Sequence, residues 1–122
     1  MAKRRISESD GVVAVRAAVA GERARPVLAT ATRFLLEELA TLAPGNALEV
    51  RVPPFGATQC LPGPRHTRGT PPGVVETDPE TWLALATGGI GWDEALAAGR
   101  VTASGVRADL APLLPIWRLP QA

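Results

Sequence analysis

Residues 26–52 read PVLATATRFLLEELATLAPGNALEVRV, a helical pattern followed closely by a strand pattern. Apolar residues in the first half recur at three- and four-residue steps, which predicts a helix that buries one face. Pro26 suits the first turn of that helix, and Pro44-Gly45 ends it. Residues 48–52 then alternate apolar and charged side chains, as a half-buried strand does. Helix and strand can therefore pack against each other through one core.

The predicted elements on either side are shorter. Upstream, residues 12–20 predict a second helix. Downstream, residues 62–73 are rich in proline and glycine and predict a loop, and Asp78-Pro79 has the composition of a capped helix start. The other predicted elements are strands at 57–61 and 74–76, a helix from 92 to 98, a strand from 100 to 104, and a terminal helix from 108 to 117 that Pro112 and Pro115 interrupt or end.

The order of these elements predicts the fold class. Strands grouped ahead of helices, the first two in a hairpin, indicate an α+β domain with a mostly antiparallel, twisted sheet and helices packed on one face. Four strands can be counted. The length of 122 residues suits one domain. We expect that domain over residues 12–119, preceded by a flexible tail at 1–11.

Charge and hydropathy exclude several classes of function. The chain has 13 Lys and Arg against 12 Asp and Glu, so its net charge of +1 gives no reason to expect nucleic-acid binding. No run approaches about 18 uninterrupted apolar residues, so we expect no integral membrane association. The lone Cys60 excludes an intramolecular disulfide and a cysteine-based metal site. These features predict a cytoplasmic protein.

Three runs carry a resemblance to a known family. They are RVPPFGATQC (51–60), GPRHTRGTPP (63–72) and VVETDP (74–79), and they resemble the sterol-carrier-like family of actinobacteria. The C-terminal third, with Trp82-Leu83-Ala84-Leu85 and then GRVTASG (99–105), is similar to the broader type-2 sterol carrier domain. The resemblance extends over roughly residues 26 to 117 of the chain.

The resemblance implies a fold and a function. The family that the chain resembles has a five-stranded sheet. We therefore expect four to five strands here, with an edge strand missing, very short, or within residues 62–73. It also implies an apolar tunnel between sheet and helices that accepts lipids, fatty acids, acyl-CoA or sterols. For the actinobacterial branch it implies no particular substrate.

The first candidate site is a set of large apolar side chains on the predicted helices. Aromatic faces of this kind pack well against an acyl chain or a ring system. An ordinary filled core shows the same periodicity and remains the alternative. The predicted ligand-binding residues are Phe34, Leu35, Leu39, Trp82, Leu83, Trp92, Leu96, Leu113 and Trp117.

The second candidate site lies in the predicted loop. Arg65, His66, Arg68 and Thr70 gather cations and a hydroxyl that suit the phosphate or carboxylate of a ligand headgroup. The alternative is that these arginines pair with local acids such as Glu76 or Asp78 and simply fix the path of the chain.

The sequence predicts no catalytic residue, cofactor or metal site. Cys60 and His66 could form a thiolate–imidazole pair, but a strand cysteine is more often a small buried hydrophobe. We therefore expect non-catalytic binding or transport of an apolar small molecule. The alternative is a protein-interaction module with a filled core, and a homodimer stays open. A weaker alternative is an enzyme accessory domain, because the fold also resembles the C-terminal domain of mycothiol-dependent maleylpyruvate isomerase.

Overall fold

The structure is a computed structural model that describes residues 5–63, 72–106 and 108–118 of the chain. In these ranges helices and strands alternate in short groups. In chain order the elements are α1 (Glu8–Val19), α2 (Arg25–Leu42), β1 (Leu48–Val52), β2 (Gly56–Cys60), β3 (Gly73–Thr77), α3 (Pro79–Thr87), α4 (Trp92–Ala97), β4 (Val101–Ser104) and a 3-10 turn at Ala111–Leu113.

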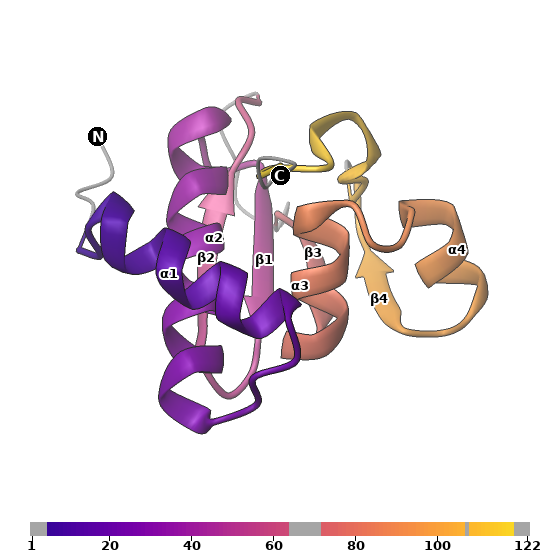
Figure 1. The fold of residues 1–122 in the computed structure, drawn as a ribbon. Coiled ribbons are helices and arrows are strands. Elements are labelled where there is room, and N and C mark those ends of the chain that lie inside the picture. Colours follow the sequence, from indigo (N-terminus) through magenta and orange to yellow (C-terminus); the bar gives the residue numbers. More distant parts are fainter. Residues whose placement is uncertain (1–4, 64–71, 107, 119–122) are drawn as a thin grey trace.

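The strands of the described ranges form one sheet in the order β2-β1-β3-β4 (Figure 1). β1 pairs antiparallel with β2, as the predicted hairpin requires, β3 pairs antiparallel with β4, and β1 runs parallel to β3. The α+β class and the mostly antiparallel sheet are therefore confirmed. The described ranges hold four strands and no fifth, while residues 64–71 of the predicted loop lie outside them.

One face of the sheet is covered and the other is open. Leu48, Val50 and Val52 of β1 are fully buried, whereas Arg51 between them is exposed. Figure 1 shows α1, α2 and α3 on the same side of the sheet. On the opposite side Arg51 lies in register with Glu76 of β3, so that face is polar. The alternation read from residues 48–52 thus separates core from solvent, as predicted.

α2 contributes more buried residues than any other described helix. Its Phe34, Leu35 and Leu39 side chains are all 0% exposed. α1 crosses α2 on the side away from the sheet (Figure 1), and Gly11 permits the close approach. A Cβ atom at Gly11 would lie only 2.1 Å from Cδ1 of Phe34, so any side chain there would displace the ring.

α1 begins earlier than the sequence pattern indicated. The predicted tail ended at residue 11, but the helix starts at Glu8 with Ser7 as its N-cap. The Ser7 hydroxyl accepts a hydrogen bond from the backbone N–H of Asp10 at 3.1 Å, and acidic residues in the first turn favour the helix dipole. The backbone N–H of Ile6 also donates to Glu37 of α2, at 3.2 Å. Capping, rather than hydrophobic periodicity, sets this boundary.

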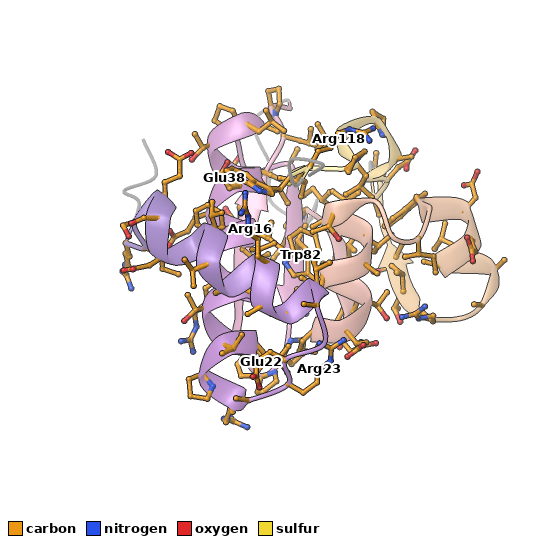
Figure 2. All side chains as sticks on the ribbon, viewed as in Figure 1. Arg16, Glu22, Arg23, Glu38, Trp82 and Arg118 are labelled. Atoms are coloured by element: carbon orange, nitrogen blue, oxygen red, sulfur yellow. The ribbon has the colours of Figure 1, made fainter. Side chains whose placement is uncertain are left out.

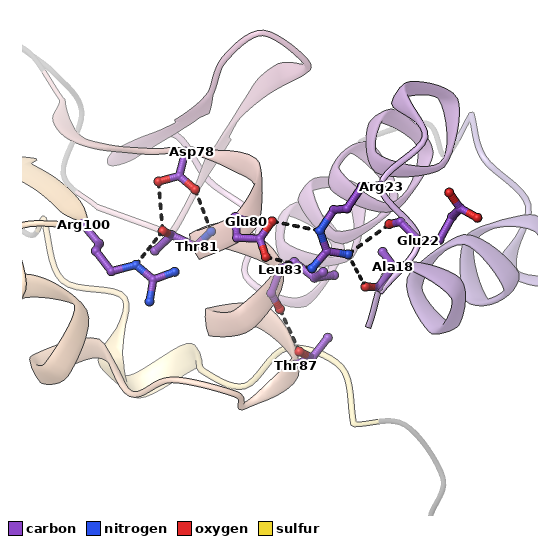
Figure 3. Close-up of polar contacts among 9 residues, drawn as sticks. All are labelled: Ala18, Glu22, Arg23, Asp78, Glu80, Thr81, Leu83, Thr87 and Arg100. Carbon is purple, nitrogen blue, oxygen red and sulfur yellow. Dashed lines mark hydrogen bonds and ion pairs between the residues drawn. The ribbon is translucent and has the colours of Figure 1, made fainter. Parts of the chain in front are cut away.

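α3 is capped as predicted and is tied to two other parts of the chain (Figure 3). The Asp78 carboxylate accepts from the backbone N–H of Thr81 at 2.8 Å and from its hydroxyl at 2.9 Å. Arg100, just before β4, donates to the same hydroxyl at 3.1 Å. At the exposed side, Arg23 in the α1–α2 turn bridges to Glu80 at 2.8 Å. The N-terminal end of α3 therefore links the helical layer to the edge of the sheet.

The predicted C-terminal helix is wrong. Between residues 108 and 117 the chain forms only the 3-10 turn at Ala111–Leu113, and Leu114 is extended with φ −99° and ψ 144°. Pro112 and Pro115 explain this, because each lacks a backbone N–H and disfavours helical backbone in the residue before it. We call residues 110–118 the C-terminal strap. The backbone N–H groups of Ile116 and Trp117 both donate to the carbonyl oxygen of Ala86 in α3, at 2.8 and 2.9 Å.

Gly11→Ala should destabilise the protein by about 2 kcal/mol, because overpacking against Phe34 outweighs the better helix propensity of alanine. Urea unfolding followed by circular dichroism measures the difference. Val13→Ala in the same helix is the control: Val13 is 68% exposed, and its truncation should change stability by less than about 0.5 kcal/mol. A Gly11→Ala protein as stable as the wild type would contradict the packing of α1 on Phe34.

Asp78→Ala should cost about 1–2 kcal/mol, because it removes the acceptor for the buried first turn of α3. Asp78→Asn keeps one acceptor oxygen, so its free energy of unfolding should fall by less than half as much as that of Asp78→Ala. The melting temperatures of the two variants decide the point. Equal losses would assign the effect to the charge of Asp78 and not to its capping bond.

Candidate ligand-binding site

The structure brings most of the predicted apolar residues into one cluster. α2 and α3 place Phe34, Leu35, Leu39, Trp82 and Leu83 in the core, and α4 adds the buried Trp92. Leu113 and Trp117 of the strap are partly buried and pack against the same core. Leu96 is the exception, because it lies on the outer side of α4 and is 39% exposed. The apolar spacing in residues 92–98 does not define which side of so short a helix faces the core, so the prediction placed Leu96 there wrongly.

Two tryptophans in this cluster differ in their polar contacts. Trp82 is fully buried near the centre of the molecule (Figure 2), and its indole N–H donates to the backbone oxygen of Thr32 at 3.2 Å. Trp117 packs edge-on against Phe34, with ring centroids 5.4 Å apart and an interplanar angle of 72°. Its indole nitrogen is buried and has no hydrogen-bond partner among the described residues. A donor of this kind is uncommon in a folded protein.

The interior is closed around these residues. Four surface pockets lie between described residues, and none of the four is lined by Phe34, Leu35, Leu39 or Trp82. Phe34, Leu35, Leu39 and Trp82 are all 0% exposed, so in the described part of the chain neighbouring side chains fill the space around them, where the resemblance implied a tunnel. The pocket beside the strap has a volume of about 370 Å³ and is lined by Leu85, Gly88, Ile90, Gly91, Trp92, Asp93, Glu94, Ala111, Leu114, Pro115 and Arg118. It is the one of the four that reaches a predicted ligand-binding residue, Trp92.

Sequence reasoning missed the contribution of α1 and of the start of the strap. Val15 and Ala18 of α1 are both 0% exposed, and so is Leu110. The spacing of the buried positions Gly11, Ala14, Val15 and Ala18 is the helical signal that could have revealed this face. Leu110 stands at helical spacing from Leu113, Leu114 and Trp117 within the predicted terminal helix, but it was not among the predicted ligand-binding residues.

The predicted headgroup site cannot be compared with the structure. Arg65, His66, Arg68 and Thr70 lie within residues 64–71, outside the described ranges. Of the acids considered as their local partners, Glu76 is exposed on the open face of the sheet, and Asp78 is engaged with Thr81. The anion-binding role of the loop stays a prediction.

The one cysteine is buried and of low reactivity. Cys60 ends β2, is 0% exposed and packs in the core, which confirms its interpretation as a small buried hydrophobe. Burial raises the pKa of its thiol to about 11. The part of the chain that the structure describes holds no group of three or more His, Cys, Asp or Glu side chains arranged to bind a metal ion. The helices in that part are too short or too polar to cross a bilayer.

Comparison with known proteins supplies the family. The model of the bacterial SCP ortholog family matches residues 24–116, which include every described element from α2 to the 3-10 turn of the strap and leave out α1. A search of curated proteins found no match. The match does not address an actinobacterial origin, which stays a prediction. The chain belongs to the bacterial family of sterol-carrier-like (SCP) proteins.

Proposed function

We propose that this protein binds an apolar, lipid-like ligand between its helices and its sheet, without covalent chemistry. The observation that carries the proposal is the construction of the interior. Around Phe34, Trp82 and Leu110 it consists almost wholly of aliphatic and aromatic side chains, and one border is a strap that lacks regular secondary structure. Such an interior offers a ligand dispersion contacts and burial of apolar area. Membership of the sterol-carrier-like family supports the same function.

The chemistry of the buried polar groups supports binding over catalysis. The buried polar side chains among the described residues are Thr32, Thr77 and Thr81. The Thr77 hydroxyl donates to the backbone oxygen of Arg100 at 2.8 Å, and the Thr81 hydroxyl belongs to the cap of α3. Both hydroxyls are thus engaged in contacts that hold the fold together, Thr81 through Asp78 and Arg100. We place the activity in the cytoplasm, where an unpaired cysteine is ordinary.

The ligand class is a fatty acid, acyl-CoA, other lipid or sterol-like molecule. The apolar walls suit any of these, and the predicted headgroup residues Arg65, His66, Arg68 and Thr70 would distinguish them by charge. An acyl-CoA or a fatty acid would use that loop, whereas a sterol would not.

A second candidate function has an observation of its own. The core is filled, and an apolar groove of about 480 Å³ lies between α1 and α2 on the surface. Val13, which is 68% exposed, lies on this groove beside Pro26 and Val27. A protein-interaction module would dock its partner on such a surface and would need no internal cavity.

Native mass spectrometry on freshly purified protein separates the two functions. We expect a fraction of the protein to carry an added mass that denaturation and organic extraction release as a fatty acid, phospholipid or sterol-like species. The control is the same preparation after delipidation, which should show the bare monomer and recover the added mass when palmitate is supplied. A bare monomer whose melting temperature does not respond to palmitate, oleate or cholesterol would refute lipid binding. A homodimer or a bound protein would favour the interaction module.

Cys60 should react with a disulfide reagent such as DTNB about a hundredfold more slowly in the native protein than after unfolding. The reason is that burial raises its pKa from 9.0 to about 11, and the thiolate is the reactive form. Absorbance at neutral pH, with and without denaturant, measures the two rates. Cys60→Ser gives the background rate. Fast native modification would mean an accessible, activated thiol and would reopen covalent catalysis.

A further inference from the structure

We propose that Trp117 is a displaceable plug: its indole fills, in this closed structure, the space beside Phe34 that the chain of a bound lipid takes in the loaded protein. This inference rests on the proposed function and specifies how the site opens. It follows from three features of the strap, namely its polar contacts, its attachment and its neighbouring pocket.

The indole N–H of Trp117 makes no hydrogen bond to the described part of the chain that would hold the ring in its present position, in contrast to the indole N–H of Trp82. Trp82, a fixed core residue, has its indole N–H satisfied by the backbone oxygen of Thr32 at 3.2 Å. Trp117 buries the same group without a partner among the described residues. Closing the strap therefore leaves one donor unsatisfied, and opening it returns that donor to water. This offsets part of the loss of the edge-on contact with Phe34.

The attachment of the strap permits movement at one end. Leu110 at its start is 0% exposed and fixed in the core, whereas residues 113–117 are only partly buried. Among the described residues, the strap beyond the 3-10 turn makes two backbone hydrogen bonds with the body of the protein, from Ile116 and Trp117, and both use the Ala86 carbonyl. Apart from side-chain packing, contact with this one oxygen holds the end that carries Trp117 to the described part of the body.

A pocket lies where the ligand would enter. The pocket of about 370 Å³ has Leu114 and Pro115 of the strap on one side and Ile90 and Trp92 on the other. Trp117 and Phe34 do not line this pocket in the closed structure, and the proposal requires that the pocket and the space beside Phe34 become continuous when Trp117 moves away. The added space is only one indole wide, so it suits a single flexible acyl chain better than a rigid sterol. Arg118 also lines the pocket and is the cation there that would face the carboxylate of a fatty acid, whereas Asp93 and Glu94 on the same rim would repel it.

Fluorine NMR on protein labelled with 5-fluorotryptophan tests the movement in the wild-type chain. The three tryptophans give three resonances, and Trp117→Phe identifies one of them by its loss. We expect palmitate to shift the Trp117 resonance and to increase its response to replacing H₂O by D₂O, since the ring becomes exposed. The Trp82 resonance should keep its low solvent response and serves as the internal control.

The affinity of a plug-free variant tests the same point independently. Trp117→Ala should bind palmitate roughly tenfold more tightly than wild type, as expected if the open state is populated at about a tenth. Pro112→Ala, an exposed change in the same strap, should leave the affinity unaltered. Isothermal titration calorimetry provides the dissociation constants.

The outcomes separate this inference from the proposed function. If wild type binds palmitate but the Trp117 resonance stays still, or if Trp117→Ala binds more weakly, Trp117 is a fixed wall and the plug is refuted while lipid binding stands. If Trp117→Ala binds palmitate and wild type does not, the indole closes the site without yielding to the lipid, and the displaceable plug is refuted. If neither protein binds palmitate, both ideas are overturned.

Discussion

The ring of Phe34 is held between two segments that lie far from it in the chain. α1 crosses it at Gly11, where there is no side chain to push it away, and Trp117 packs edge-on against it. Its own helix carries Leu35 and Leu39 into the core beside the sheet. The first helix, the central helix and the C-terminal strap thus meet on one aromatic side chain. The arrangement of the helical layer depends on that contact because it fixes how closely α1 and the strap approach α2, while Val15, Ala18 and Leu110 add further core contacts.

Much of this fold could be predicted from the sequence, and the reasons are local. The central helix and β1 follow from strong periodicity in residues 26–52, and Asp78-Pro79 marks the start of α3 by composition alone. The start of α1 was misjudged because Ser7 acts through a cap, which leaves no apolar pattern. The strap was misjudged because Leu113, Leu114 and Ile116 suggested a helix that the neighbouring prolines prevent.

For the candidate site, prediction from the sequence failed for a different reason. Eight of the nine predicted apolar residues do reach the core or its border, and the exception is Leu96 on a helix of only six residues. Whether such a cluster encloses a tunnel or a filled core could not be read from periodicity, because both need the same apolar positions. That difference resides in side-chain packing, and above all in where the strap places Trp117. The loop with Arg65 and His66 lies outside the described residues, so its role rests on composition alone.

The polar, open face of the sheet affects whether copies of this chain associate with one another. Arg51 sits beside Glu49, to which it is paired, and in register with Glu76 on the adjacent strand. Stacking two such faces would take these charges out of water, at a cost that a flat apolar face would not have. The edge strands are only five and four residues long, so they present few free backbone groups to another chain. At high concentration the sheet side therefore resists self-association, even while the opposite side keeps its hydrophobic interior.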